Sequence, residues 1–502
     1  MKRRMLFFAL AVAALAWALV TLREGGAGVT REAVAIGAIP ATLFHPPSGA
    51  PKALVVVAHG FAGSQQMMAP LATTLARDGY LALTFDFAGH GRNPLPMPGG
   101  IKDMAESTRA LTAEVNAALD YARTRPEFNG KLAALGHSMA SDLVVMAATG
   151  RQDVDAVVAL SLFGAGVTAT SPKNLLVMDG ALEVAMLRDA ARRIVALTCA
   201  DPRQGETYGD FAAGTARRYA YARGVEHIGV IWSLDAQNAA RDWLDAAFGA
   251  APAATGVDRR GPWIGLMGLA LCVLVGLGVG LAPQIAAQAP LAPVAPGRFY
   301  ALAAFAALAT PLLLWKAPTD FLPILLGDYL AAHFAVYGAL LWLGLWLLRS
   351  PGGPAGTPLA GVLVAGVALA ALYLFAFGVP LDIYVTSFWP VGQRWALIPV
   401  EALAVALAFS AEERLARGER APRFAYSALK LGFVVSLIAA IALNPMRLFF
   451  LAIVAPVVAV LFVAFGFLNR AAYRRTLSPY VGALGAAGAL AYAICVTFPM
   501  VE

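Results

Sequence analysis

The sequence predicts a chain of two parts: an α/β domain with a doubly wound, mostly parallel sheet, followed by an all-α polytopic membrane bundle. Three observations predict it. First, 59% apolar and only 14% charged residues are too apolar a balance for a soluble chain of 502 residues. Second, residues 23–260 alternate short apolar segments with amphipathic ones. Third, residues 261–502 consist of long apolar runs separated by short polar loops.

A further apolar run opens the chain. Lys2, Arg3 and Arg4 precede an apolar segment over residues 6–22, which is typical of a cleaved signal peptide or of an uncleaved signal anchor. The absence of a clear small-x-small cleavage site before Arg23 favours the anchor. We therefore expect a signal anchor at 1–22, an α/β domain at 23–260 and a membrane domain at 261–502.

The elements of the α/β domain follow from the spacing of its apolar residues. Residues 53–58 are continuously apolar, as in a strand buried on both faces. Residues 103–125 carry an apolar stripe between polar positions, as in a surface helix. We expect a strand pair within 34–44 and strands at 53–58, 81–86, 132–135, 154–162, 175–178 and 217–222. We expect helices at 64–78, 103–125, 139–149 and 233–248.

The membrane domain contains eight apolar runs that approach or exceed the roughly 20 residues a helix needs to cross a bilayer. They lie near 262–282, 299–316, 321–348, 358–379, 391–410, 424–443, 447–468 and 479–499. If the N-terminus is cytoplasmic, the inside loops hold most of the arginines, although Arg259 and Arg260 run against this rule. The inside arginines are Arg298, Arg349, Arg414, Arg417, Arg420, Arg423, Arg470, Arg474 and Arg475. This asymmetry predicts a multi-pass protein of the cell (inner) membrane with its α/β domain on the extracytoplasmic, periplasmic side.

The net charge of +7 does not predict a nucleic-acid partner. Residues 23–260 balance 22 Lys and Arg against 23 Asp and Glu, so the excess comes from the N-terminus and the membrane loops. Three cysteines cannot form a disulfide framework. Ionisable residues in or near the spans are candidates for function or for structural pairing. They are Asp328, His333, Arg394, Glu401 and Lys430.

The most informative motif is Gly136-His137-Ser138-Met139-Ala140, which follows a short apolar strand and precedes a predicted helix. A tight strand-to-helix turn with small residues two positions on either side of a serine holds its hydroxyl clear of the sheet. Alone, this pentapeptide is a weak signal.

With its neighbours, the motif resembles the α/β-hydrolase superfamily over about residues 30–250. A His59-Gly60-Phe61-Ala62-Gly63 turn follows one strand, and an Asp86-Phe-Ala-Gly-His-Gly-Arg92 turn follows the next. The serine turn comes third, and Gly224-Val-Glu-His227 follows the last strand. The resemblance implies Ser138 as nucleophile, His227 as base, and an oxyanion hole formed by the backbone amides of Phe61 and Met139.

The acid of the triad is less clearly indicated. The family places its acid three residues after a glycine that ends a strand, which here selects Glu183 after Gly180. Asp179 is the alternative if the strand end is displaced, and Asp201 and Asp210 are more distant candidates.

These patterns predict a membrane-tethered serine hydrolase of esterase or lipase type, which cleaves an ester, thioester or related acyl bond. Anchoring suggests a lipid or an acylated envelope component as substrate. Two alternatives remain open: a non-catalytic binding or sensing module, and a lipid-handling or transport protein with an accessory hydrolase domain. The sequence predicts no metal site and no organic cofactor, and it does not indicate an oligomeric state.

Overall fold

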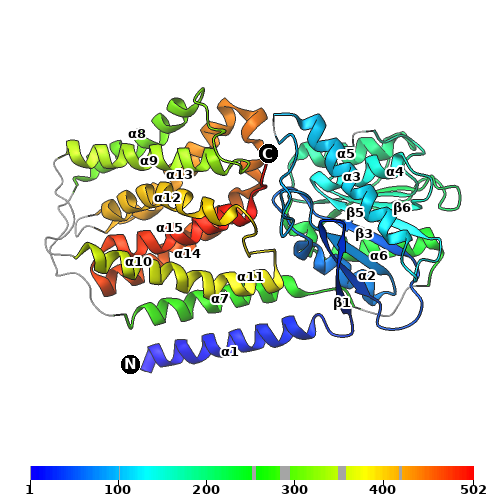
Figure 1. Ribbon diagram of the computed structural model, residues 1–502, viewed down its shortest axis with the longest axis horizontal. Coiled ribbons are helices and arrows are strands. Elements are labelled where there is room, and N and C mark those ends of the chain that lie inside the picture. The colour runs from blue at the N-terminus through cyan, green and yellow to red at the C-terminus, as the bar shows by residue number, and fades with distance from the viewer. Residues whose placement is uncertain are drawn as a thin grey trace. The chain divides into compact units, whose positions relative to one another are not determined.

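The computed structural model describes residues 2–100, 102–164, 166–251, 256–282, 294–348, 358–417 and 421–502. The chain divides into two compact units (Figure 1). The sheet unit comprises Trp17–Gly265, Leu381–Trp389 and Pro499–Glu502. The helical unit comprises Met1–Ala16, Leu266–Pro380 and Pro390–Phe498. Two short segments that belong to the second half of the sequence therefore belong to the sheet unit.

The sheet unit is built on one eight-stranded sheet in the order β1-β2-β4-β3-β5-β6-β7-β8. β1 and β2 form an antiparallel hairpin, β2 pairs antiparallel with β4, and every later pairing is parallel. The strands are β1 (Thr30–Ile36), β2 (Ile39–His45), β3 (Leu54–Ala58), β4 (Leu81–Phe85), β5 (Leu132–His137), β6 (Ala156–Leu160), β7 (Leu175–Gly180) and β8 (Arg217–Ala222). The predicted mostly parallel α/β sheet is confirmed.

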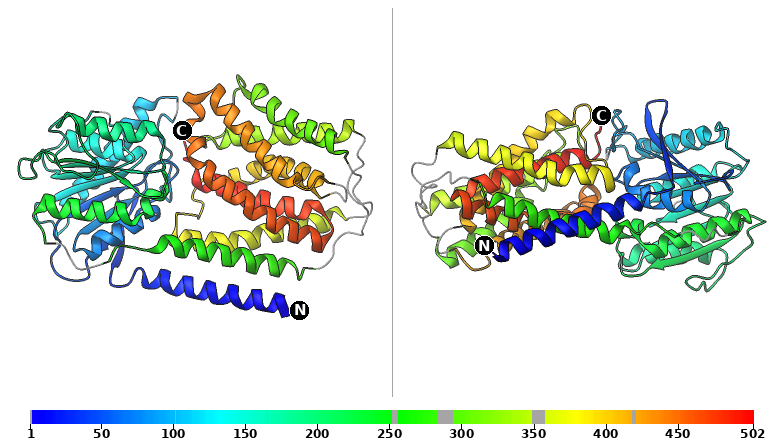
Figure 2. Two further views of the ribbon diagram at one scale, coloured as in Figure 1. Left: turned by 180° about the vertical axis from the view of Figure 1, so that it is seen from behind. Right: turned by 90° about the horizontal axis from the view of Figure 1, so that it is seen from below.

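Helices cover both faces of this sheet (Figures 1 and 2). α2 packs against α6, and α3 packs against α4. The helices are α2 (Ala69–Arg77), α3 (Met104–Arg123), α4 (Met139–Thr149), α5 (Ala185–Ala196) and α6 (Leu234–Phe248). The side chains of Asp103 and Ser233 cap α3 and α6 by accepting from backbone N–H groups of the first turn. The sheet unit therefore buries its parallel strands between two helical layers.

Sequence reasoning did not predict α5. Its buried side chains Leu187, Ala190, Ala191 and Ile194 follow the i, i+3, i+4, i+7 spacing of an amphipathic helix. The sequence therefore carries a local signal for this helix.

The described part of the helical unit, with α1, contains nine helices that are long and apolar enough to cross a membrane. Each of the nine predicted apolar segments forms such a helix, which suggests a multi-pass membrane protein. The helices are α1 (Lys2–Glu24), α7 (Arg260–Val279), α8 (Pro296–Leu314), α9 (Gly327–Leu347), a continuous α10–η3–α11 helix (Leu359–Tyr384), α12 (Arg394–Ala416), α13 (Ala425–Leu443), α14 (Pro445–Thr476) and α15 (Pro479–Thr497). Arg349 and Arg420 lie outside the described residues.

Candidate active site

Ser138 stands on a strained turn between β5 and α4. Its backbone has φ 55° and ψ −123°, a conformation that non-glycine residues rarely adopt. The turn is fixed because the Ser138 N–H donates to the Leu160 carbonyl at 2.8 Å. A methyl group at Gly136 would lie 2.3 Å from the Ala140 carbonyl oxygen, so only glycine fits where the chain crosses itself. The sequence thus places a serine hydroxyl at the carboxyl end of a central strand.

Two loops from later strands bring an imidazole and a carboxylate to this hydroxyl. His227, from the loop after β8, has its Nε2 2.8 Å from the Ser138 Oγ. Its Nδ1 is 3.0 Å from the Oε2 of Glu183, which follows β7. Because a carboxylate can only accept, the proton lies on Nδ1 and Nε2 is left to accept from the serine hydroxyl.

The Glu183 carboxylate is nearly buried and fully hydrogen-bonded. Its Oε1 accepts from the Ser161 hydroxyl at 2.6 Å and from the Gly180 N–H at 2.9 Å. Burial alone would raise the pKa of Glu183, but the hydrogen bond and charge of His227, helped by these two donors, lower it below its ordinary value. Glu183 is therefore held as an anion beside the imidazole.

Asp179, the alternative acid, has a different environment. Its side chain is completely buried in β7, and the residue that contacts His227 is Glu183. Burial, and after it the charge of Glu183, raise the pKa of Asp179 to about 8. Asp179 is thus uncharged at neutral pH, four residues before the ionised Glu183.

The turn over residues 59–63 lies directly against Ser138. A methyl group added to Gly60 would sit 2.9 Å from the Ser138 Cβ, so a side chain there would displace the nucleophile. His59 Nε2 accepts from the Phe87 N–H at 3.2 Å, which places the proton on Nδ1, and Nδ1 donates to the Gly60 carbonyl at 2.8 Å. The Gly63 N–H donates to the same carbonyl at 3.1 Å.

These bonds fix the direction of the neighbouring amide. The Gly60 carbonyl and the Phe61 N–H belong to one planar trans peptide and point in opposite directions. Met139 begins α4, and the first N–H groups of a helix have no acceptor within it. Burial lowers the pKa of His59, so this imidazole stays neutral and keeps its donor role.

Comparisons with known proteins agree with this architecture. Residues 49–196 match the family model described as serine aminopeptidase, S33. No curated protein matches the chain. This chain contains an α/β-hydrolase domain.

Solved structures to which the chain is similar share little sequence with it. TT1662 from Thermus thermophilus is 16% identical, with 44% of this chain and 99% of that one covered and a TM-score of 0.34. A putative dienelactone hydrolase from Klebsiella pneumoniae is 15% identical, with 44% and 99% covered and a TM-score of 0.34. E-2-(acetamidomethylene)succinate hydrolase is 14% identical, with 43% and 100% covered and a TM-score of 0.31.

Two further residues of the hydrolase domain support His227 and Glu183, and sequence reasoning did not assign them these roles. The His137 Nε2 lies 2.8 Å from the backbone carbonyl of His227. Burial and then the charge of His227 lower the pKa of His137 to about 3, so it is neutral and donates this bond. Ser161, at the end of β6 with φ 62°, supplies the hydroxyl on Glu183. Ser161 stands in no motif, so only the pairing of β6 with β7 could reveal it.

The Asp86 turn of the hydrolase domain has a structural role. The Asp86 carboxylate accepts from the Gln65 N–H at 2.7 Å, from the Gln65 amide at 3.0 Å and from the Arg92 N–H at 3.1 Å. It therefore ties the loop after β4 to the chain that leaves the turn at residues 59–63.

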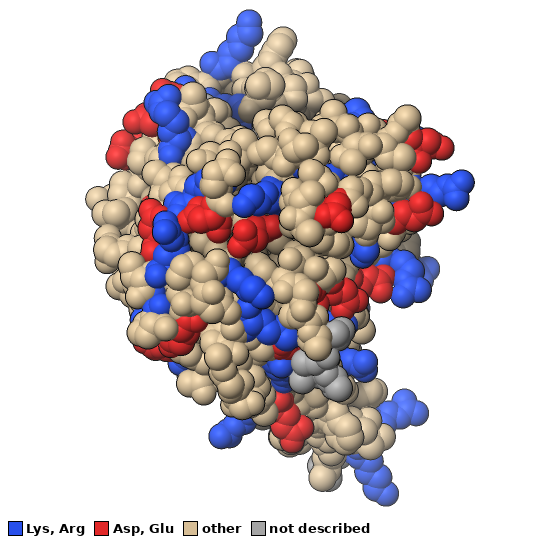
Figure 3. Space-filling model, turned by 90° about the vertical axis from the view of Figure 1, so that its right-hand side faces the viewer, with Lys and Arg blue, Asp and Glu red and all other residues tan. Residues whose placement is uncertain are grey.

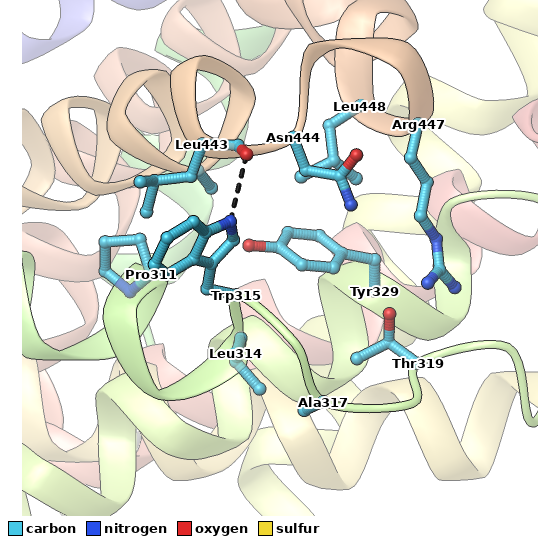
Figure 4. A pocket seen from close by; sticks show the side chains of 11 residues that line it. Pro311, Leu314, Trp315, Ala317, Thr319, Tyr329, Leu443, Asn444, Arg447 and Leu448 are labelled. Carbon is cyan, nitrogen blue, oxygen red and sulfur yellow. Dashed lines mark hydrogen bonds between the residues drawn. The ribbon is translucent and has the colours of Figure 1, made fainter.

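The helical unit has a pocket of a different kind (Figure 4). Trp315 donates to the Leu443 carbonyl at 3.1 Å, with Tyr329 beside it. Arg447 also lines the pocket, and its guanidinium pairs with Asp320 at 3.3 Å. The eleven lining residues include no serine, cysteine, histidine or carboxylate, so this pocket lacks the set of groups found at Ser138.

Proposed function

We propose that this protein is a membrane-tethered serine hydrolase that cleaves an ester, thioester or related acyl bond. The observation that carries the proposal is the continuous relay from Ser138 Oγ to His227 Nε2 at 2.8 Å and from His227 Nδ1 to Glu183 at 3.0 Å. A nucleophile within hydrogen-bond reach of a base, itself oriented by a third group, is the arrangement that nucleophilic catalysis needs.

In the proposed mechanism, the Ser138 oxygen attacks the substrate carbonyl carbon and its proton passes to His227 Nε2. Glu183 stabilises the imidazolium and holds its tautomer. The N–H groups of Phe61 and Met139 donate to the oxyanion. The leaving group departs with the proton from His227, which leaves Ser138 acylated. Water, or another hydroxyl acceptor, then gives its proton to His227 and attacks the acyl carbon. The bond to the Ser138 oxygen breaks, that oxygen takes the proton back from His227, and the acyl product leaves.

Exposed apolar side chains near the acid support an acyl or lipid-like substrate. Leu182 and Val184, on either side of Glu183, are 67% and 59% exposed. Phe163, just beyond the end of β6, is 46% exposed. Apolar surface on such loops favours an apolar acyl group over a charged one. We expect p-nitrophenyl octanoate to be cleaved with a higher kcat/KM than p-nitrophenyl acetate, and equal values would contradict this substrate class.

We further propose that the hydrolase domain lies outside the cytoplasm, as the loop arginines indicate. Basic and acidic side chains are interspersed on the face in Figure 3, which gives no support to a nucleic-acid partner. Cys199 is partly exposed in the sheet unit, so its labelling can show on which side of the membrane the hydrolase domain lies. In intact spheroplasts a membrane-impermeant maleimide should label the wild type more strongly than Cys199→Ser. Labelling of Cys199 only after permeabilisation would reverse the orientation.

The central test is labelling of the detergent-solubilised full-length protein with a fluorophosphonate probe. We expect the wild type to be labelled, Ser138→Ala to be unlabelled, and His227→Ala to react at least about 10³-fold more slowly. Ser48→Ala, which changes an exposed serine of the same unit, is the matched control and should react as the wild type does. A folded wild type without labelling, or labelling that survives Ser138→Ala, would refute the proposal.

A further inference from the structure

The segment Leu381–Trp389 lies in the sequence between two candidate membrane spans, but it belongs to the sheet unit. Its first four residues are the last turn of the Leu359–Tyr384 helix, and α12 begins at Arg394 soon after it. The C-terminal residues Pro499–Glu502, which follow α15, also belong to the sheet unit. Two segments attached to membrane spans are thus part of the unit that holds Ser138.

The segment Leu381–Trp389 contacts Ser64, the residue that follows the turn at residues 59–63. Ser64 follows Gly63 directly and is almost completely buried. Its Oγ accepts from the Ser387 N–H at 2.9 Å and lies 3.0 Å from the Thr386 hydroxyl. Ser64 and Ser387 are buried and Thr386 is half-buried, so loss of the Ser64 hydroxyl would leave the buried Ser387 N–H without this partner.

A second contact of the segment lies near the surface. Asp382 accepts from the Arg92 guanidinium at 2.7 Å and from the Phe388 N–H at 2.8 Å. The Arg92 side chain is 44% exposed, and an exposed ion pair contributes little to stability. The contacts of Ser64 are therefore the stronger constraint on the turn.

The C-terminal residues bind the other loop beside the turn. The Met500 N–H donates to the Gly89 carbonyl at 2.9 Å, and the Met97 N–H donates to the Met500 carbonyl at 2.8 Å. Met97 and Val501 form a parallel β-bridge. The same loop contains His90, whose ring lies 5.3 Å from that of His59 and 6.1 Å from that of Phe61. Both loops around the Phe61 amide are thus held by chain from the second half of the sequence.

We propose that Thr386 and Ser387 are positioning residues of the hydrolase: by holding Ser64, they hold the turn that presents the Phe61 N–H to the oxyanion. This inference rests on the proposed serine-hydrolase function. It makes turnover in the sheet unit depend on a segment that is continuous with two membrane spans. A displaced turn weakens a donor that acts mainly in the transition state, so its loss lowers kcat more than it raises KM.

The test uses full-length variants and p-nitrophenyl butyrate in detergent. We expect Ser64→Ala, which removes both contacts, to lower kcat about 10-fold, and Thr386→Val to lower it about 3-fold to 5-fold. KM should change less than 2-fold in both variants. These losses are smaller than the roughly 10²-fold to 10³-fold cost of removing one oxyanion donor completely, because the turn is displaced rather than lost. Thr386→Ser keeps the hydroxyl and should restore wild-type kcat. Ile383→Ala, an exposed change on the same segment, is the matched control.

Two readouts separate positioning from loss of fold. First, all variants should still be labelled stoichiometrically by fluorophosphonate. Second, kcat of the Ser64→Ala/Thr386→Val double variant should be no lower than kcat of Ser64→Ala, because both substitutions act through one contact. Wild-type kcat in Thr386→Val, equal losses in Thr386→Val and Thr386→Ser, or additive losses in the double variant would overturn the inference. If Ser64→Ala fails to fold, the comparison of kcat between Thr386→Val and Thr386→Ser still tests the inference. A folded wild type that is neither labelled nor active refutes the proposed function itself.

Discussion

The sheet unit and the helical unit both bury ionisable side chains, but those side chains are arranged differently. In the sheet unit Ser138, Glu183 and His227 come from the ends of three different strands and meet within hydrogen-bond distance. The Glu183 carboxylate contacts the His227 imidazole, and the imidazole contacts the Ser138 hydroxyl on its strained turn. Convergence of this kind is what the proposed acyl-transfer chemistry requires.

Among the described residues of the helical unit several buried polar groups are paired locally, whereas both carboxylate oxygens of the buried Glu401 have no hydrogen-bond partner. Lys430 of α13 forms an ion pair with Glu412 of α12. Its ammonium lies 3.4 Å from the centroid of the Phe409 ring and 4.4 Å from that of Phe462. A carboxylate and two ring faces together satisfy a cation that would be costly to bury alone.

His333 and Arg394 follow the same pattern. His333 Nε2 lies 3.0 Å from the Ser436 hydroxyl and its Nδ1 lies 3.3 Å from the Tyr329 hydroxyl. Arg394 donates to the backbone carbonyl of Phe498 at 2.8 Å, at the end of α15. These contacts tie neighbouring helices to one another. Burial of an ionisable group therefore does not by itself distinguish the two units, whereas the kind of partner that the group contacts does.

The largest expected effect separates the two carboxylates of the sheet unit. Glu183→Gln should lower kcat about 10³-fold to 10⁴-fold, because an amide does not hold the imidazole in its productive tautomer or stabilise its charge. Asp179→Asn should change kcat less than 3-fold, since Asp179 is uncharged at neutral pH. Steady-state kinetics on a p-nitrophenyl ester measure both. The reverse ranking would make Asp179 the acid and would show that contact with His227 is a poor guide.

The next effect tests whether the polar groups of the helical unit are structural. Lys430→Met leaves the buried Glu412 carboxylate without its partner and should destabilise the protein by about 3–5 kcal/mol. Adding Glu412→Leu should restore most of that loss, because replacing both partners of a buried pair with apolar groups is often neutral. Thermal unfolding in detergent, followed by tryptophan fluorescence, reports both.

The fluorophosphonate reaction provides the control for this test. The Ser138 labelling rate of the folded fraction should stay within 2-fold of the wild-type rate in both Lys430 variants. A stable Lys430→Met protein whose labelling rate nevertheless collapsed would connect this ion pair to the hydrolase and break the contrast between the units.

Much of the sheet unit could be predicted from the sequence because its signals are local. Continuous apolar strands, the Gly136–Ala140 turn and the histidine after the last strand are each readable within a few residues. The contacts of Ser64 with Thr386 and Ser387 could not be predicted, since they join residues more than 320 positions apart. The same holds for Ser161, which reaches Glu183 only through strand pairing. Periodicity predicts elements but does not identify long-range partners.

The smallest effect concerns the energetic cost of placing Asp179 beside Glu183. The folded protein keeps the Asp179 proton up to a pKa of about 8, whereas the unfolded chain releases it near 3.8. Between these values the unfolded state binds fewer protons, so stability falls as pH rises. Asp179→Asn removes this dependence and should gain on the order of 2–3 kcal/mol relative to the wild type between pH 5 and pH 7.5. Tm of the wild type and of Asp179→Asn, measured at pH 5 and at pH 7.5, tests this prediction. If Asp179→Asn stabilised the protein equally at the two pH values, Asp179 would be ionised in the folded protein. Two neighbouring buried anions, Asp179 and Glu183, would then need another source of compensation.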